Sequence, residues 1–199
     1  MKTKIAVLVS GGGTNLQALI DAQGNVLTSG EIALVVANNA NAYALERAKK
    51  AGIPTAVVLK KQCGSQEAFE EKLKVILSEY GIEVIILAGF MTILTEKFTS
   101  CYPKRILNVH PSLIPSFCGE GFYGLRVHEA ALRKGVKVTG ATIHYVNEIP
   151  DGGEIIDQKA VEVLPGDTPE SLQRRVMEQA EWILLPRAVE HVAALIQNS

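Results

Sequence analysis

The chain has 199 residues, of which 47% are hydrophobic and 21% charged, a composition typical of one globular domain with a full core. Its formal net charge of -1 argues against nucleic acid as a partner, because such proteins carry a basic excess. The longest uncharged apolar run, Val84–Met91, is too short to span a membrane, and three scattered cysteines without a C-x-x-C pair favour reduced thiols and a cytoplasmic location.

The amino-terminal half alternates segments typical of strands with segments typical of helices. Strands are predicted from β-branched runs at Ile5–Val9, Ile32–Ala37, Thr55–Leu59 and Val84–Leu87. Helices are predicted from the stretches between them, at Asn15–Gln23, Ala42–Lys50 and Gln66–Tyr80. Such alternation indicates βαβ units, and therefore a parallel sheet with helices on both faces.

The carboxy-terminal half has a different order of elements. The predicted strands are Ile106–Val109, Thr139–Tyr145 and Glu154–Val163, with a helix at Val127–Arg133. A last helix is expected to begin after an N-cap at Thr168, and Pro186 is expected to kink or split it. The predicted fold class is α/β: a three-layer, Rossmann-like fold with a mostly parallel central sheet, helices on both faces and a C-terminal antiparallel strand segment.

The segment SGGGTNLQALI joins the first predicted strand to the first predicted helix. Its glycines let the backbone turn tightly and present N–H groups at a helix N-terminus, an arrangement that suits a phosphate. The segment lacks the G-K-[ST] ending of a P-loop, and Leu16 replaces the third glycine of a dinucleotide fingerprint. We therefore expect a phosphate-binding loop; the alternative is a tight turn that binds nothing.

Two polar side chains, Asn108 and His110, interrupt the apolar run LNVHPSLIPSF. Because one residue separates them, they should project from the same face of a strand, at the carboxyl end where open α/β sheets bind ligands. The alternative is a capped strand end, with His110 hydrogen-bonded to backbone. Asp151 precedes two glycines that would let its loop bend back over the sheet, although a plain Asp-Gly turn is the commoner meaning. Spacing alone does not bring Asp151 to His110.

Four motifs, SGGGTNLQALI, ILAGFMTIL, NVHPSLIPSF and PDGGEII, occur in this order along the chain. Together they resemble the formyl-transfer domain of folate-dependent enzymes, most closely the members that act on glycinamide ribonucleotide (GAR). The resemblance implies one domain over residues 1–199, with a phosphate-binding half at about 1–100 and a catalytic, folate-binding half at about 101–199. It implies that the amine of GAR attacks the formyl carbon of 10-formyltetrahydrofolate directly, through a tetrahedral intermediate, in purine (IMP) biosynthesis. It implies no metal.

The resemblance also implies a role for each matching residue. Asn108, His110 and Asp151 form the catalytic set: an oxyanion donor, a proton donor to the leaving nitrogen, and a carboxylate that orients the imidazole and raises its pKa. The positions implied to bind GAR and its phosphate are Gly13, Thr14, Asn15, Gly89, Pro111 and Glu181. The positions implied to bind the folate are Gln66, Leu87, Phe90, Met91, Thr92, Ile93, Leu94, Asn108, Asn147 and Glu148. Thr92 and Gln66 stand where basic residues are expected, so contacts to the glutamate tail of the folate are left open.

Three alternatives remain. A 10-formyltetrahydrofolate hydrolase would share the catalytic set but usually carries an extra N-terminal domain, whereas this chain begins at its first strand. A methionyl-tRNA formyltransferase would need an RNA-binding domain and a basic surface. A non-catalytic phosphate-binding module would give the Asn–His–Asp set no role. We expect GAR and the folate as partners, neither nucleic acid nor membrane, and a monomer or weak homodimer; His128, after the glycine-rich loop 116–127, is interpreted as structural.

Overall fold

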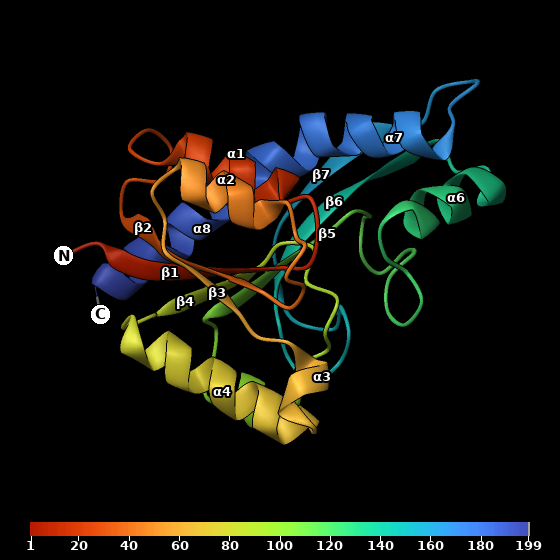
Figure 1. The fold of residues 1–199 in the computed structure, drawn as a ribbon. Helices are drawn as coiled ribbons and strands as arrows, with labels where there is room; N and C mark the ends of the chain where they lie inside the picture. The colour runs from red at the N-terminus through yellow and green to blue at the C-terminus, as the bar shows by residue number, and fades with distance from the viewer. Residues whose placement is uncertain (199) are drawn as a thin grey trace.

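The computed structural model describes residues 1–198, and a seven-stranded sheet forms its centre (Figure 1). The strands are β1 (Thr3–Val9), β2 (Gly30–Ala37), β3 (Thr55–Val57), β4 (Val84–Leu87), β5 (Ile106–His110), β6 (Val138–Tyr145) and β7 (Ile155–Glu162). Their order in the sheet is β3-β2-β1-β4-β5-β6-β7. The pairs among β1 to β5 are parallel, whereas β6 pairs antiparallel with both β5 and β7. The predicted fold class is therefore confirmed.

Helices occupy most of the connections between the strands. They are α1 (Thr14–Ala22), α2 (Ala44–Lys50), α3 (Lys60–Cys63), α4 (Gln66–Glu79), α5 (Glu96–Thr99), α6 (Leu125–Lys134), α7 (Pro169–Val176), the π-helix η1 (Met177–Glu181) and α8 (Trp182–Gln197). The short helices α3 and α5 were not predicted, because a single turn is too short to show an apolar periodicity. Within residues 1–198, no helix combines the length and the apolar character needed to cross a membrane.

The helices cover both faces of the sheet, with α1, α2 and α8 on one face and α4 on the other (Figure 1). The helices on both faces turn apolar side chains inward: α1 buries Leu16 and Leu19, and α4 buries Phe69 and Leu73. Strand β4 is buried along its whole length because both of its faces are covered. This double burial explains why its sequence, VIIL, shows no alternation of polar and apolar residues.

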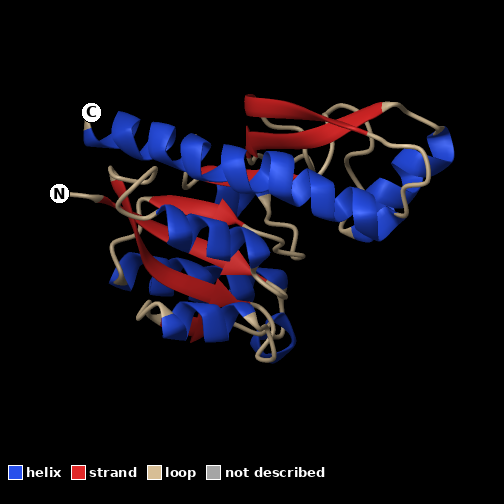
Figure 2. Cartoon of the chain, turned by 90° about the horizontal axis from the view of Figure 1, so that it is seen from above, coloured by secondary structure: helices blue, strands red, loops and turns tan. Residues whose placement is uncertain are grey.

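The C-terminal helix is interrupted at a place other than the predicted one. Thr168 caps α7 as predicted, and its hydroxyl accepts the Ser171 N–H at 3.2 Å. The chain then forms η1 and continues as α8 through Pro186 without a break, so the expected split at Pro186 is wrong. A proline ring in a helix conflicts with the carbonyl group four residues earlier, which here belongs to Trp182, the first residue of α8. That carbonyl lies at the junction with η1, where the backbone already departs from α geometry. Figure 2 shows α7, η1 and α8 as one long rod that crosses the molecule.

The order of the strands reverses between β1 and β4, since the chain runs outward from β1 to β3 on one side and from β4 to β7 on the other. Ligands of open α/β sheets bind at the carboxyl ends of the strands beside such a reversal. The glycine loop follows β1, Gly89 follows β4, and β5 ends at His110. The Met91 N–H donates to the Ser10 hydroxyl at 2.9 Å and so ties the first two segments together. The fold therefore gathers the predicted site segments at one edge.

Candidate active site

Four polar side chains meet where β5 and β6 approach the loop between β6 and β7. Asn108 and His110 project from β5, His144 lies opposite Asn108 on β6, and Asp151 comes from the loop. The Asn108 Nδ2 atom lies 3.1 Å from His144 Nε2 and 3.3 Å from Asp151 Oδ1. Asp151 Oδ2 lies 3.3 Å from His110 Nδ1, and Asp151 Oδ1 lies 3.5 Å from His144 Nε2. The structure thus brings the three proposed catalytic residues together and adds His144.

The loop geometry explains how Asp151 reaches the cluster. Asp151 has a φ of 55°, in the left-handed region that aspartate tolerates better than most residues. Its carboxylate is held by the Gly119 N–H, which donates to Oδ2 at 2.9 Å. At Gly153, a Cβ atom would collide with the carbonyl oxygen of Tyr145. The second glycine of the Asp-Gly-Gly motif therefore lets this loop pack directly against the end of β6.

Both ring nitrogens of His110 face oxygen atoms. Nδ1 faces the Asp151 carboxylate, and Nε2 lies 2.9 Å from the Phe117 carbonyl oxygen, which can only accept a hydrogen bond. Only the cationic ring can donate to both. Burial opposes that charge and lowers the pKa of His110, and the raising effects of Asp151 and the Phe117 carbonyl do not outweigh it. The expectation that Asp151 lifts this pKa above its usual value is therefore wrong, because desolvation dominates.

His144 and Asn108 form the second half of the cluster. The His144 Nδ1 atom lies 2.7 Å from the Tyr145 carbonyl oxygen, so in the neutral ring this nitrogen carries the proton. Nε2 then accepts a hydrogen bond from Asn108 Nδ2. The second proton of the Asn108 amide is directed to Asp151. Both amide protons are thus held inside the cluster, and a ligand that receives one must replace a partner.

Asp151 carries the negative charge of the cluster. Burial raises its pKa, but contacts to His144, His110 and the Gly119 N–H lower it by more, so the net pKa lies below the usual range. At neutral pH the group is a carboxylate between two imidazole rings, and it favours positive charge on the His110 ring. Within residues 1–198, no group of three or more His, Cys, Asp or Glu side chains is arranged to hold a metal ion.

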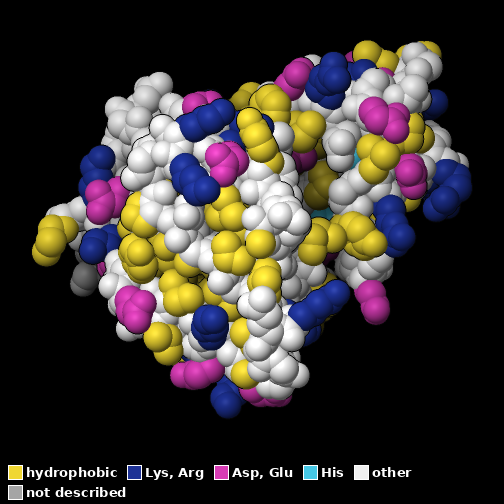
Figure 3. All heavy atoms as spheres, viewed as in Figure 1, with side chains coloured by type: hydrophobic (Ala, Val, Ile, Leu, Met, Phe, Trp, Pro, Cys, Tyr) yellow, Lys and Arg dark blue, Asp and Glu magenta, His cyan; other side chains and the backbone are white. Residues whose placement is uncertain are grey.

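A cavity of about 130 Å³ opens beside the cluster. Its lining includes every position proposed for the folate except Gln66: Leu87, Phe90, Met91, Thr92, Ile93, Leu94, Asn108, Asn147 and Glu148. His144 and Asp151 also line it, so the cavity shares a wall with the cluster. Met91 and Ile93 are 54% and 65% exposed and offer apolar surface at the mouth. Figure 3 shows that the surface is hollowed on this side, with histidine atoms visible in the hollow.

The two positions that depart from the family pattern are both occupied by internal hydrogen bonds. Gln66 Nε2 donates to Glu70 Oε1 at 2.6 Å and to the Ile93 carbonyl at 3.1 Å. Thr92 Oγ1 accepts a hydrogen bond from Asn38 Nδ2 at 2.8 Å. Gln66 therefore supports the cavity wall from behind, and Thr92 fixes the loop after β4. Neither position supplies a cation to the cavity.

The glycine loop forms the other side of the site. Gly13 is the N-cap of α1 with a φ of 72°, and a Cβ atom there would lie 2.6 Å from the Ala44 Cβ atom. Both the left-handed backbone and the close approach of α2 therefore require glycine. Two residues further on, Asn15 Nδ2 donates to Glu181 Oε2 at 2.7 Å. The structure thus joins the loop to η1, across most of the length of the chain.

Glu181 is an acid in an unusual environment. It is 6% exposed, and burial raises its pKa to about 7 against the opposing hydrogen bond from Asn15. The Asn15 Oδ1 atom is buried and has no hydrogen-bond partner within residues 1–198. Of the remaining positions proposed for GAR, Thr14 begins α1, Gly89 lies two residues after the end of β4, and Pro111 directly follows β5. A buried carboxyl group and a buried amide oxygen without a partner therefore lie together between the glycine loop and η1.

Sequence reasoning missed several groups in the cluster. His144 could have been found, because it is an imidazole in the predicted strand sequence ATIHYV, which contains no Lys, Arg, Asp or Glu. The Phe117 carbonyl and the Gly119 N–H are backbone groups, which no side-chain motif reveals.

His128 is fully buried as its structural interpretation requires, yet neither of its nitrogens has a partner within residues 1–198. Burial and the nearby His110 lower its pKa to about 4.

Comparison with known proteins gives a consistent result. The family model for formyl transferases matches residues 3–189. A phosphoribosylglycinamide formyltransferase of Haemophilus influenzae is 41% identical over 187 residues, which cover 94% of this chain and 85% of that protein. The trifunctional purine biosynthetic protein adenosine-3 of Gallus gallus is 47% identical over 97% of this chain, but the chain spans only 19% of that protein.

Solved structures agree with this match. The crystal structure of glycinamide ribonucleotide transformylase 1 from Symbiobacterium toebii superposes with a TM-score of 0.90 at 40% identity, and the match covers 97% of this chain and 88% of that one. A phosphoribosylglycinamide formyltransferase from Coxiella burnetii gives a TM-score of 0.89, also at 40% identity, over 98% of this chain and 88% of that one. The sequence match, the shared architecture and the motifs at the sheet edge lead to one conclusion: this chain belongs to the formyl transferase family.

Proposed function

We propose that the protein transfers the formyl group of 10-formyltetrahydrofolate to the amine of GAR. The observation that carries the proposal is that Asn108 and His110 each lie 3.3 Å from the Asp151 carboxylate, and that Asn108 and Asp151 line an apolar-mouthed cavity. The glycine loop lies along the same edge of the sheet, where open α/β folds bind phosphates. One cluster of groups for acyl chemistry thus lies between two candidate substrate sites.

The two substrates approach the cluster from opposite sides. The N–H groups of the glycine loop and the α1 N-terminus receive the phosphate of GAR, and the Asn15–Glu181 pair accepts hydrogen bonds from its hydroxyl or glycinamide groups. The pterin of the folate enters the cavity lined by Phe90 and Met91, where backbone and apolar groups surround it. The formyl carbon then lies over Asn108. This arrangement contributes to catalysis by holding the amine and the formyl carbon in position to react.

The reaction begins when the amine lone pair of GAR attacks the formyl carbon. The carbonyl π electrons move to oxygen and form a tetrahedral oxyanion. The Asn108 amide donates to this oxygen and gives up one of its present contacts, to Asp151 or His144, as it does so. The oxyanion then re-forms the carbonyl and expels the folate nitrogen N10. A donor aimed at the oxyanion contributes roughly 10²–10³ in kcat.

His110 moves the proton that this exchange requires. Its lowered pKa keeps the ring mainly neutral at pH 7, as a base must be before the reaction. When substrate replaces the Phe117 carbonyl at Nε2, Nδ1–H donates to Asp151 and Nε2 becomes free to take a proton from the attacking amine. Asp151 stabilises the imidazolium that results, which then delivers the proton to N10. The products are formyl-GAR and tetrahydrofolate, and the protein regains its starting protonation.

Steady-state kinetics of His110→Ala test this assignment. We expect kcat to fall by about 10²–10⁴ with the KM for GAR changed less than about threefold, because the ring moves a proton but does not bind the phosphate. His191→Ala is the matched control, since His191 is an exposed histidine on α8 and should leave both constants unchanged. Undiminished turnover by His110→Ala would remove His110 from the mechanism. Release of formate without formyl-GAR would instead identify a hydrolase.

The pH dependence gives an independent test of Asp151. Because the Asp151 charge raises the pKa of His110 against burial, Asp151→Asn should move the His110 titration to lower pH. The measurement is the pH profile of kcat, checked by NMR titration of the ring. An unmoved or raised titration would contradict the pairing.

A further inference from the structure

A second cavity, of about 460 Å³, lies on the face of the sheet that α1, α2 and α8 cover. Three parts of the chain enclose it. They are α1 together with the loop that follows it, Arg47 of α2, and the start of α8. It shares only Thr14 with the positions proposed for GAR, and none with the folate cavity. Its volume falls in the range of small-molecule sites, about 300–1,000 Å³.

The floor of this cavity is apolar. Ala18 and Val26 come from the α1 side, and Ile183 and Pro186 come from α8. Trp182 completes the wall with the largest apolar surface of any residue type. Its indole Nε1 is buried and has no hydrogen-bond partner within residues 1–198.

The rim of the cavity is basic. Arg47 donates from Nε to the Gly12 carbonyl at 2.8 Å and from one terminal nitrogen to Gln17 at 3.0 Å, but among the described residues it forms no ion pair. Arg187 is exposed and likewise has no carboxylate partner within residues 1–198. The one acid in the lining, Asp21, accepts a hydrogen bond from the Gln17 amide at 2.8 Å.

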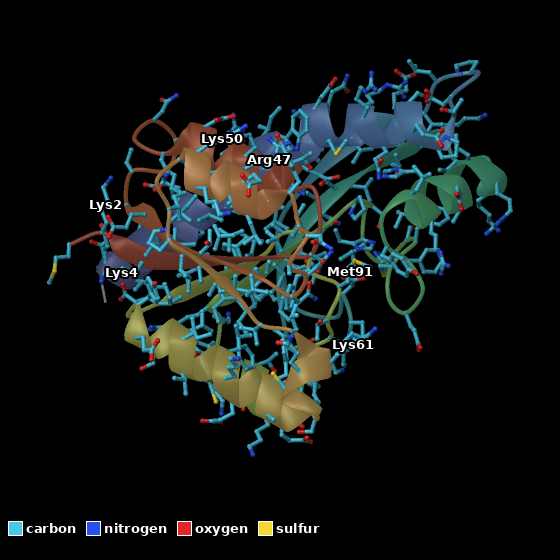
Figure 4. All side chains as sticks on the ribbon, in the orientation of Figure 1. Lys2, Lys4, Arg47, Lys50, Lys61 and Met91 are labelled. Carbon is cyan, nitrogen blue, oxygen red and sulfur yellow. The ribbon has the colours of Figure 1, made fainter. Side chains whose placement is uncertain are left out.

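An adjoining hollow strengthens the positive character. It has a volume of about 330 Å³, shares Gln17 and Arg47 with the cavity, and adds Lys50. Figure 4 shows Arg47 and Lys50 together on α2, on the same face as α1. The guanidinium of Arg47 is held in place over the Tyr43 ring, 5.2 Å from its centroid. A fixed guanidinium loses little freedom when it binds an anion, so this edge is prepared for one.

We propose that this second cavity binds an amphipathic anion, a ligand with an aromatic or branched apolar body and a carboxylate or phosphate group. The apolar body occupies the floor formed by Ala18, Ile183 and Pro186, against the Trp182 ring. The anionic group lies at the rim between Arg47 and Arg187. The cavity shares only Thr14 with the positions proposed for GAR, and binding at its floor and rim can be tested independently of the proposed function.

Trp182 makes the test direct, because it is the single tryptophan of the chain. Titration of the full-length protein with 3-phenylpropionate and with phenyl phosphate should give a saturable change in tryptophan fluorescence. It should also shift the single indole N–H resonance in the NMR spectrum. Neutral 3-phenylpropanamide should bind about fivefold more weakly than the better anion, the discrimination expected of partly exposed arginines. The comparison of the two anions identifies which anionic group the rim prefers.

Two variants locate the binding. Ala18→Leu fills the floor with a residue that favours helix, and it should weaken both anions by at least about tenfold. Arg187→Gln should weaken the anions by about threefold to fivefold and leave the amide unchanged. Arg133→Gln is the matched control, since Arg133 is an exposed arginine on α6, away from the cavity, and it should have no effect.

Four results would overturn the proposal. The first is a fluorescence and indole response that never saturates. The second is equal binding of anion and amide, and the third is binding that neither Ala18→Leu nor Arg187→Gln weakens. The fourth is an indole resonance that moves with protein concentration and not with added anion. That result would make this face a contact between copies of the chain.

Discussion

His128 should set a large part of the acid sensitivity of this fold. This residue belongs to α6, its side chain is fully buried, and its pKa is lowered from 6.5 to about 4. In the unfolded chain the same group takes up a proton near pH 6.5. Between pH 6.5 and pH 4, His128 is protonated in the unfolded state but neutral in the folded state. The free energy of unfolding therefore falls as the pH is lowered from 6.5 to 4. At about 1.4 kcal/mol per pH unit, the difference amounts to about 3 kcal/mol.

The perturbation that tests this is His128→Phe, which keeps an aromatic ring of similar size. At pH 7 the variant should be about as stable as the wild type or slightly more stable, because it removes two nitrogens without partners. By pH 4 the wild type should have lost about 3 kcal/mol relative to the variant. Glu181 titrates with the opposite sign, since its raised pKa stabilises the fold as the pH falls from about 7, but it is common to both proteins and cancels.

The assay is urea unfolding of both proteins at several pH values between 4 and 7.5, with the slope m checked for constancy. The quantity of interest is the difference in unfolding free energy between wild type and variant at each pH. A difference that grows steadily below pH 6.5 supports the reasoning. Parallel curves would refute it, because they would mean that the buried ring titrates as it does in the unfolded chain.

Three further substitutions have defined outcomes. In steady-state assays, Asn108→Ala should lower kcat by about 10²–10³ and change the KM for GAR less than about threefold, because the amide acts on the oxyanion. A change confined to KM would contradict that role. Glu181→Gln should raise the KM for GAR about tenfold at pH 8. In the wild type this KM should fall as the pH rises through about 7, where the Glu181 carboxyl ionises, and the variant should lose that pH dependence. A variant that keeps the pH dependence of the wild type would exclude Glu181 from GAR binding. Gly13→Ala should lower stability by about 2 kcal/mol, a Tm shift of about 4–8 °C by calorimetry, because the new Cβ atom meets Ala44 at 2.6 Å. The matched control Gly12→Ala has open space around it and should shift Tm far less.

The sequence predicted the architecture well because its signals are local. Strand β4 was predicted with its exact bounds, since an apolar run bounded by glycine and polar residues is legible without tertiary information. The short helix α3 and the π segment η1 were not foreseen, because neither has a periodicity of its own. The expected split at Pro186 is wrong for a related reason: the effect of a proline depends on the helix geometry four residues earlier, which the sequence does not display.

The candidate site was predictable only where its geometry depends on a single strand. The two-residue spacing of Asn108 and His110 places them on one side of a strand, and this followed from the strand alone. Asp151 could not be placed by spacing, since its position depends on a loop that folds against Tyr145 through Gly153. The pKa of His110 was misjudged because the depth of burial, which outweighs its charged neighbour, appears only in the folded chain.

The central claim is that this protein moves a formyl group from folate to GAR by direct attack. The most direct measurement uses 10-formyltetrahydrofolate labelled with ¹⁴C in the formyl group, incubated with GAR and the purified protein. We predict that the label appears in formyl-GAR at the rate at which tetrahydrofolate forms, and that Asn108→Ala slows both equally. Label recovered as formate, or label that stays on the folate while GAR is present, would contradict the account.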